Sequence, residues 1–324
     1  MRGLYESHAR PLTRIVRGLP TSWDPSIATM PFPGHVTVAA WSPCSSIAIS
    51  WGRYFPTVEI LDAATLARLT ILEFPTDDLA IGSRLIFSPD GRLLMWAGSS
   101  RAGEKLISWD LQTGVVVNAI SVTGGSIAYS ACGTMFGVSS YGSSGATINI
   151  HNAHSGTHMC SHQVRGRVSG EIWAHGEYLR FTTATPRSIT TWEAGFTSTH
   201  APTEVETLSI PDDCHYPGSF LVHPTLPRIA LFHGGRVRVW NTQDSKFLLD
   251  SAHGAYDDTM TFSPDGRFFA CDSATPEGTF AGIRLWKESD TGYILHQKLI
   301  YDFRVRRALI SPNGGSVIAR SVVS

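Results

Sequence analysis

The stretch FSPDGRLLM, residues 87–95, has a near copy in FSPDGRFFA, residues 262–270. In both copies a Ser-Pro-Asp-Gly turn separates two apolar runs. Proline presets φ at the second turn position, aspartate bonds to nearby backbone, and glycine accepts positive φ, so the motif favours a tight reversal between two strands. Because this hairpin recurs 175 residues further along the chain, the pair predicts a repeated unit with further copies between them.

Five weaker copies of the pattern are present, at 38–50, 127–139, 171–182, 220–232 and 308–319. Each unit continues with a second pair of strands around an Asp or Asn turn, as in KLISWDLQTGVVVNAI (105–120) and RVRVWNTQDSKFLL (236–249). A unit of about 45 residues therefore holds four short strands. The expected first turns lie at Ser42, Ser88, Ser130, Ala174, His223, Ser263 and Ser311.

Four short strands repeated around an axis form the blades of a β-propeller. The ends SWD, TWE, VWN and LWK, and Trp109-Asp110 before LQTG, resemble the signature of WD-repeat (WD-40 type) propellers over residues 35–321. The resemblance implies an all-β fold, a β-propeller of about seven four-stranded blades. The repeats are divergent, because the family's Gly-His pair matches in order only at Gly34-His35.

The last unit is incomplete, since 13 residues follow Ser311. The segment LTRIVRGL (12–19) has the apolar pattern of a strand. Propellers often close their ring by pairing the two chain ends, which removes exposed sheet edges. We therefore expect residues 1–33 to be a lead-in that contributes a strand to the closing blade, and residues 34–324 to form the WD-repeat-like propeller.

Composition bounds the function. The chain has 42% hydrophobic and 16% charged residues and a formal net charge of −1, which gives no global field to attract nucleic acid or an anionic membrane. No apolar segment approaches the length of a membrane span. The five cysteines form no C-x-x-C pair and indicate reduced thiols. We expect a cytoplasmic protein, with a nuclear location left open, that binds neither nucleic acid nor membrane.

Common catalytic motifs are missing from the sequence. It contains no P-loop, no G-x-G-x-x-G, no H-E-x-x-H and no G-x-S-x-G. The recurring Trp109, Trp192, Trp240 and Trp286 occupy one position of the repeat, which indicates a packing role and not a binding cage. The sequence therefore predicts a protein that is not an enzyme and needs no cofactor.

The segment HNAHSGTHMCSH (151–162) holds four histidines and a cysteine. On a hairpin with its turn at AHSG, His151 would face His158, and Cys160 would follow on the same side by the two-residue period of a strand. These three side chains are the candidate zinc ligands. The alternative interpretation is an exposed outer hairpin rich in histidine, and on that interpretation we expect no metal.

Acidic pairs stand just ahead of three units. If they share one end of the ring, they form an acidic rim that could receive a basic segment of a protein or peptide partner. The alternative is that they are ordinary solvated loop carboxylates. The candidate partner-binding residues are Asp77, Asp78, Asp212, Asp213, His215, Asp257 and Asp258.

Three functional classes remain. The first is a non-enzymatic protein-protein interaction scaffold or adaptor of the WD-repeat type. The second comes from a resemblance: the phrases VEILDAATLARL, ISWDLQTG and GLPTSW are similar to the propeller regions of fungal NACHT-type receptors and WD-repeat-like proteins. That resemblance implies the sensor portion of such a receptor. The third class is a propeller hydrolase or lyase with carboxylates at the central channel.

Overall fold

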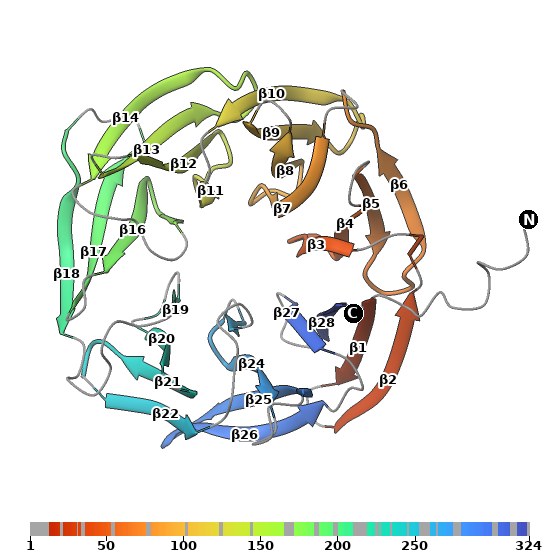
Figure 1. Ribbon diagram of the computed structural model, residues 1–324, viewed down its shortest axis with the longest axis vertical. Coiled ribbons are helices and arrows are strands. Elements are labelled where there is room, and N and C mark those ends of the chain that lie inside the picture. The colour runs from red at the N-terminus through yellow and green to blue at the C-terminus, as the bar shows by residue number, and fades with distance from the viewer. Residues whose placement is uncertain are drawn as a thin grey trace, which may run out of the picture.

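The computed structural model describes residues 13–322 with short gaps. The undescribed residues within that span are 20–21, 31, 34–35, 53–55, 76–78, 101–102, 123–125, 143–144, 165–171, 185–187, 197–199, 210–218, 224–225, 227, 234, 245, 253–259, 264, 275–279, 300–303 and 312–315. The described strands form four-stranded antiparallel sheets arranged as a ring, seen face-on in Figure 1. The predicted all-β propeller fold with four-stranded blades is confirmed.

Six blades each consist of four consecutive strands. Blade 1 contains β3 (Val36–Trp41), β4 (Ser46–Trp51), β5 (Thr57–Asp62) and β6 (Arg68–Leu72). Blade 2 contains β7 (Leu79–Phe87), β8 (Leu93–Ser100), β9 (Gly103–Asp110) and β10 (Val116–Val122). Blade 3 contains β11 (Ile127–Tyr129), β12 (Met135–Gly142), β13 (Gly145–Asn152) and β14 (His158–Val164).

The next three blades follow the same order. Blade 4 contains β15 (Trp173–His175), β16 (Tyr178–Ala184), β17 (Ser188–Gly195) and β18 (Thr203–Ser209). Blade 5 contains β19 (Ser219–Val222), β20 (Arg228–His233), β21 (Arg236–Asn241) and β22 (Lys246–Ala252). Blade 6 contains β23 (Thr261–Phe262), β24 (Phe268–Ala274), β25 (Phe280–Ser289) and β26 (Gly292–Leu299). In each blade the first strand lies toward the centre of the ring and the fourth lies outside (Figure 1).

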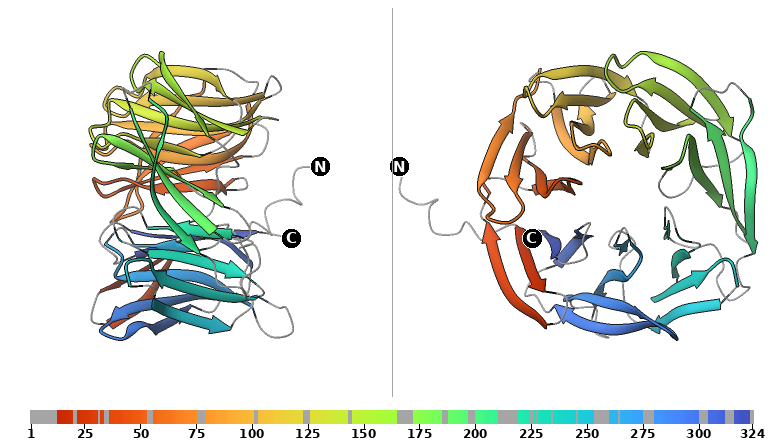
Figure 2. Two further views of the ribbon diagram at one scale, coloured as in Figure 1. Left: turned by 90° about the vertical axis from the view of Figure 1, so that its left-hand side faces the viewer. Right: turned by 180° about the vertical axis from the view of Figure 1, so that it is seen from behind.

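The remaining sheet joins the two ends of the chain. It contains β1 (Thr13–Leu19), β2 (Ser22–Met30), β27 (Arg304–Ile310) and β28 (Ser316–Val322), in the order β2-β1-β28-β27. The join is the antiparallel pairing of β1 with β28, from Thr13 opposite Arg320 to Arg17 opposite Ser316. The sequence predicted one N-terminal strand at this join, and the structure has two. Figure 2 shows the ring edge-on and from behind.

The turns predicted between first and second strands lie where expected, with one correction. Ala174 is inside β15, and the turn of blade 4 follows at Gly176, whose φ is +59°. Here His175 pairs directly with Tyr178, so the hairpin has a two-residue turn. In blade 2, five residues, 88–92, separate β7 from β8. The shorter turn moves the reversal in blade 4 closer to the end of its first strand.

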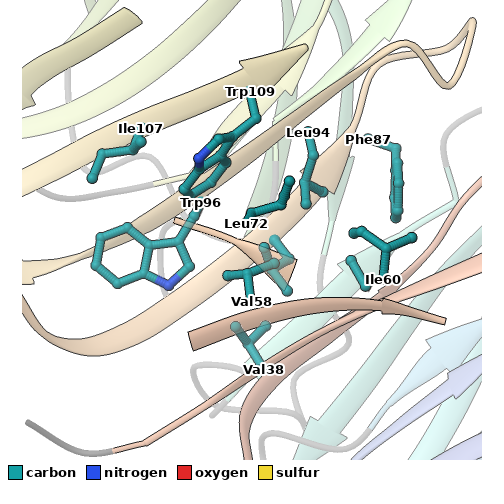
Figure 3. Packing of buried hydrophobic residues seen from close by; sticks show 11 residues of the cluster. Val38, Val58, Ile60, Leu72, Phe87, Leu94, Trp96, Ile107 and Trp109 are labelled. Carbon is teal, nitrogen blue, oxygen red and sulfur yellow. The ribbon is translucent and has the colours of Figure 1, made fainter. Parts of the chain in front are cut away.

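Buried clusters lie between neighbouring sheets. Between blades 1 and 2, Val58 and Ile60 pack against Trp96 and Trp109, all nearly inaccessible to solvent (Figure 3). Gly82 is required beside Trp96, since a Cβ there would lie 2.4 Å from the indole nitrogen. Apolar burial of this kind contributes about 1.5–3 kcal/mol per large side chain, so the packing of each blade on the next holds the ring together.

A β-bulge recurs between the third and fourth strands of all six blades. The register shifts immediately beside the position that holds Trp109, Trp192, Trp240 and Trp286, and the same shift occurs in blades 1 and 3. A bulge adds one residue to one strand, so beyond the bulge the side chains of that strand alternate between the two faces of the sheet in the opposite order.

No helix in the described part of the chain is long and apolar enough to cross a membrane.

Candidate functional site

One end of the ring, here named the turn face, carries the turns after the first and third strands of the blades. The two Ser-Pro-Asp-Gly turns have the same internal bonds. Buried Ser88 Oγ accepts from Leu93 N at 2.8 Å and donates to Asp90 Oδ1 at 2.5 Å. Ser263 repeats this arrangement with Phe268 and Asp265. The hydrogen bond from Ser88, followed by that from Arg92 N, lowers the pKa of Asp90. These carboxylates stabilise their own turns.

Neighbouring turns touch around the turn face. Cys44 Sγ of blade 1 lies 3.8 Å from the Asp90 carbonyl oxygen of blade 2. A Cβ built on Gly133 of blade 3 would lie 3.9 Å from Asp90 Oδ1. Blades 1, 2 and 3 are therefore joined by a row of turns in van der Waals contact.

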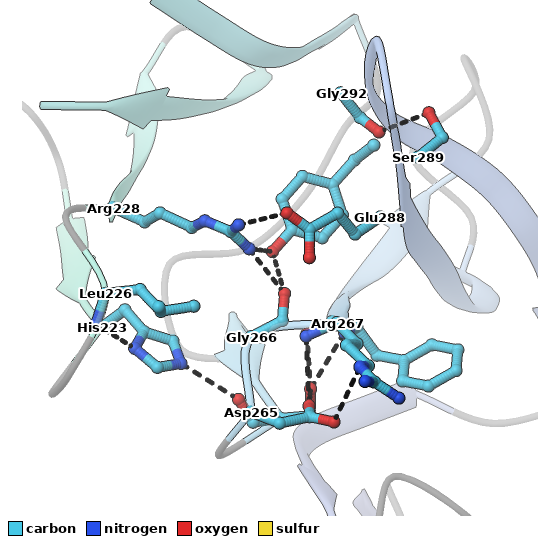
Figure 4. A network of polar contacts seen from close by, with 12 residues as sticks. His223, Leu226, Arg228, Asp265, Gly266, Arg267, Glu288, Ser289 and Gly292 are labelled. Carbon is cyan, nitrogen blue, oxygen red and sulfur yellow. Dashed lines mark hydrogen bonds and ion pairs between the residues drawn. The ribbon is translucent and has the colours of Figure 1, made fainter. Parts of the chain in front are cut away.

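Blades 5 and 6 are joined by a polar network at the turn face (Figure 4). Arg228 Nη1 donates to the Gly266 carbonyl and to the Tyr293 hydroxyl, both at 2.7 Å. Arg228 Nη2 forms a close ion pair with Glu288, and its guanidinium lies 5.5 Å from the centre of the Tyr293 ring. Burial raises the pKa of Tyr293 to about 12, so the phenol stays protonated and donates to Gly266. The Arg228 guanidinium, the Glu288 carboxylate, the Tyr293 hydroxyl and the Gly266 carbonyl thus bind one another and hold blades 5 and 6 together.

His223 takes the place of the turn serine in blade 5 and is 2% exposed. Its Nδ1 accepts from Leu226 N at 2.9 Å, and its Nε2 lies 3.2 Å from the Ser263 carbonyl oxygen. The first contact needs a nitrogen lone pair and the second an N–H, which describes a neutral imidazole. Burial lowers the pKa of His223 accordingly. Sequence reasoning placed a turn here but missed the bridge to blade 6.

In blades 1, 2, 3 and 5 the turns after the third strands are held by Asp or Asn, as predicted, whereas blades 4 and 6 have Glu193 and Lys287 at that position. Asp110 Oδ1 accepts from Gln112 N and Thr113 N at 2.9 and 3.1 Å, and Asn152 Oδ1 accepts from His154 N and Ser155 N at 3.0 and 2.9 Å. The packing role of the recurring tryptophans is confirmed as well. Trp109 and Trp286 are buried. Trp192 and Trp240 are partly buried against neighbouring clusters.

The candidate zinc ligands do not converge on one side of the sheet. His151 and His158 are directly paired, with ring centres 5.4 Å apart. The bulge after His158 turns Cys160 to the opposite side, where it is buried and donates to the Phe196 carbonyl oxygen at 3.6 Å. The two-residue period that placed His158 and Cys160 together fails at this bulge. Across the described residues, no group of three His, Cys, Asp or Glu side chains has the spacing of a metal site.

The seven candidate partner-binding residues lie outside the described residues. Their place in the chain is still informative. The first pair falls between β6 and β7, the second pair with its histidine between β18 and β19, and the third pair between β22 and β23. In the sequence, each of the three segments thus falls between the fourth strand of one blade and the first strand of the next.

The two arginines of β21 pair within their own blade. Arg236 and Arg238 both contact Asp250, at 2.7 and 3.4 Å, and the Arg238 guanidinium lies 5.5 Å from the Phe247 ring centre. The observed pairs show carboxylate and aromatic partners for both side chains.

Comparison with known proteins identifies the fold. No protein-family model matches the chain, and no curated protein matches it by sequence. A chain in the crystal structure of the mitotic checkpoint complex matches with a TM-score of 0.63 and 14% identity, covering 100% of this chain and 99% of that one. The RRP9 WD40 repeats match at 0.64 and 11%, covering 91% and 96%. U3-55K matches at 0.63 and 12%, covering 90% and 97%. Taken with its six consecutive blades and its sheet joined from both chain ends, this likeness shows that the chain folds as a WD40-type β-propeller.

Proposed function

We propose that this propeller is a non-enzymatic scaffold that binds a protein or peptide partner through the connections between its blades. The observation that carries the proposal is that the recurring serines, aspartates and tryptophans of the repeat already have structural partners within the propeller. The turn serines, the turn aspartates and the third-strand tryptophans bond to or pack against their own blade or the next. What varies from blade to blade is the connecting segments, and on a rigid scaffold such segments are where recognition residues concentrate.

The partner-binding site proposed is the set of acidic segments that hold Asp77, Asp78, Asp212, Asp213, Asp257 and Asp258, with His215 beside the second pair. Support comes from their equivalent places between consecutive blades. Three acidic pairs at one end of a ring would attract a basic segment and speed its association. The proposed partner is therefore a protein with an exposed run of Lys or Arg.

The proposal is tested by affinity capture of the tagged chain from its own cell extract, read by mass spectrometry. Asp77 and Asp78 are changed together to Lys, and the other two pairs are changed in separate variants. The matched control changes Glu177 and Asp244 to Lys. These two carboxylates are exposed and lie in turns of the turn face, so the charge change is the same at the opposite end of the ring.

A stoichiometric protein captured by the wild type and by the control, but lost from the acidic-pair variants, supports the scaffold and its site. If all variants capture the same protein in equal amounts, the acidic pairs are not the binding site, but the proposal that the propeller is a scaffold is retained. Absence of any stoichiometric protein, or turnover in a panel of ester, phosphoester and glycoside substrates, contradicts the scaffold itself. Nuclease treatment of the extract before capture separates a direct protein partner from one held by nucleic acid. The receptor-sensor and hydrolase alternatives have no observation in their favour among the described residues.

A further inference from the structure

The side of β25 that faces blade 5 carries Glu288, Trp286 and Arg284 at alternate positions, since side chains two residues apart in a strand point the same way. Glu288 forms the close ion pair with Arg228 of blade 5 (Figure 4). Trp286 belongs to the buried cluster between the two blades. Arg284 is the third side chain of this row, so it lies between blades 5 and 6.

The Arg284 guanidinium has no acceptor in this position. Its Nε is inaccessible to solvent and lacks a hydrogen-bond partner. Directly opposite on β24 is the buried Cys271, and blade 5 contributes Val237, Val239 and Leu249 to the adjoining cluster. In the described part of the chain no carboxylate forms an ion pair with Arg284. Burial lowers the pKa of Arg284, because the charged guanidinium has lost water without gaining a counter-ion.

A second cation lies directly beside the first. The residue opposite Arg284 on the outer strand β26 is Lys298, which is exposed. Opposite residues of an antiparallel pair project to the same side, with Cβ atoms about 5 Å apart. No described carboxylate forms an ion pair with Lys298 either. Like charges directly opposite one another destabilise a sheet, so the folded blade carries an uncompensated repulsion at this place.

The same place in other blades holds a bonded pair. Cross-strand partners two positions before the bulge bind each other in blades 3, 4 and 5, namely Asn149 with Ser161 at 2.8 Å, Thr190 with Thr207 at 2.7 Å and Arg238 with Asp250 at 3.4 Å. Blade 5 therefore has the same arginine as blade 6 but an aspartate opposite it. Blade 6 has Lys298 where blade 5 has Asp250, which leaves Arg284 and Lys298 to share an acceptor from outside the chain.

We propose that Arg284 and Lys298 form a binding site for a phosphate group, either free or carried by a phosphorylated side chain. A guanidinium presents a fork of donors that matches phosphate oxygens, and an ammonium adds a point charge. A phosphate monoester carries a charge of about −1.5 to −2 near neutral pH, so it balances both cations, whereas one carboxylate balances only one. This site takes the charge opposite to that of the partner proposed for the acidic segments, so it is independent of that proposal.

The test is titration calorimetry of the full chain with inorganic phosphate and, in a second arm, with O-phosphoserine, each against sodium chloride at equal ionic strength. One phosphate group should bind per chain. Arg284→Gln and Lys298→Gln should each weaken binding at least about tenfold, the effect of losing one hydrogen bond to a charged group. Tighter binding of O-phosphoserine identifies a phosphorylated side chain as the source, and equal or weaker binding identifies free phosphate.

Two further variants make the result specific. Lys298→Asp reproduces the arrangement of blade 5, so it should abolish phosphate binding and raise the midpoint of thermal unfolding. Lys287→Gln is the matched control. Lys287 is exposed in the same sheet but lies opposite Phe268, on the side that faces the closing sheet, so its loss should leave phosphate affinity unchanged.

Nitrogen-15 NMR of the arginine side chains tests the wild-type protein directly. The Nε–H signal of Arg284 should shift on addition of inorganic phosphate and stay in place with sodium chloride. An Arg284 signal that does not respond to phosphate would overturn the proposal, as would wild-type affinity in Arg284→Gln or Lys298→Asp. The NMR measurement decides the matter even if a variant folds poorly.

Discussion

Ser45 of blade 1 and Gly91 of blade 2 adopt the same left-handed backbone conformation, each as the third residue after its turn serine. Their φ angles are +63° and +70°. Glycine adopts this conformation at no steric cost, whereas an L-residue with a Cβ is strained there. Blade 1 has a serine where blade 2 has a glycine, so the backbone of this exposed turn is strained at Ser45.

We expect Ser45→Gly to stabilise the protein by about 0.5–1 kcal/mol, because relief of the left-handed strain outweighs the added freedom of the unfolded chain. Denaturant unfolding measures the change. The reverse variant, Gly91→Ala, should destabilise, since its Cβ would lie 2.9 Å from Cys44 Sγ. Leu66→Gly is the informative comparison. Leu66 has a φ of +60° but packs against a buried cluster, so its substitution should gain less than Ser45→Gly.

Arg228 and Arg236 both form ion pairs, and their different burial predicts different energies. The Arg228 side chain is 12% exposed and bonds to three groups of blade 6. Its replacement by Ala removes the ion pair of Glu288, the bond that the Tyr293 hydroxyl accepts and one of the two bonds that the Gly266 carbonyl accepts, and should cost about 2–4 kcal/mol. The Arg236 side chain is 44% exposed, so Arg236→Ala should cost less than about 1 kcal/mol. Equal losses in urea unfolding would contradict this assignment.

His223 predicts a loss of stability in acid. Its folded-state pKa lies below the ordinary value, so the unfolded chain takes up the proton first as pH falls. The free energy of unfolding should therefore decrease as pH falls below about 6.5, and His223→Gln should decrease less steeply. Thermal unfolding at a series of pH values measures both slopes.

Cys132 occupies the turn position that Asp90 and Asp265 hold in blades 2 and 6, two residues after the turn serine. Hydrogen bonds from Ser130 and then Thr134 lower the pKa of its thiol, as equivalent bonds do for the Asp90 carboxyl. Thr134 Oγ1 lies 3.0 Å from the sulfur. We expect Cys132 to be alkylated by iodoacetamide at lower pH than an ordinary thiol.

Peptide-resolved mass spectrometry across a pH series measures the alkylation midpoint of Cys132 separately from the other thiols. Thr134→Val removes one hydrogen bond and should move the midpoint to higher pH. Ser155→Ala, in an exposed turn of the same blade, should leave it unchanged. An unshifted midpoint in Thr134→Val would show that the hydroxyl does not stabilise the thiolate.

The amount of structure predictable from the sequence differs between local and long-range features. The Ser-Pro-Asp-Gly turns and the Asp and Asn caps depend on residues a few positions apart, and both were predicted. The packing role of the recurring tryptophans was predicted from their common place in the repeat. The opposite orientation of His158 and Cys160 was missed, because a bulge inserts one residue and leaves no mark in the alternation of side chains. The second N-terminal strand was missed because β2 has no regular alternation in its sequence, SWDPSIATM.

The sequence by itself determined a repeated four-stranded unit, since turn chemistry and two-residue alternation are local and recur every 45 residues or so. Only the tertiary structure decided which side chains of different blades meet. Arg228 reaches Gly266 and Tyr293, and His162 reaches Gly195 and His200, across 33 to 65 residues of chain. Such contacts depend on the angle at which one blade packs on the next, which is set by the summed fit of buried side chains and not by any short motif.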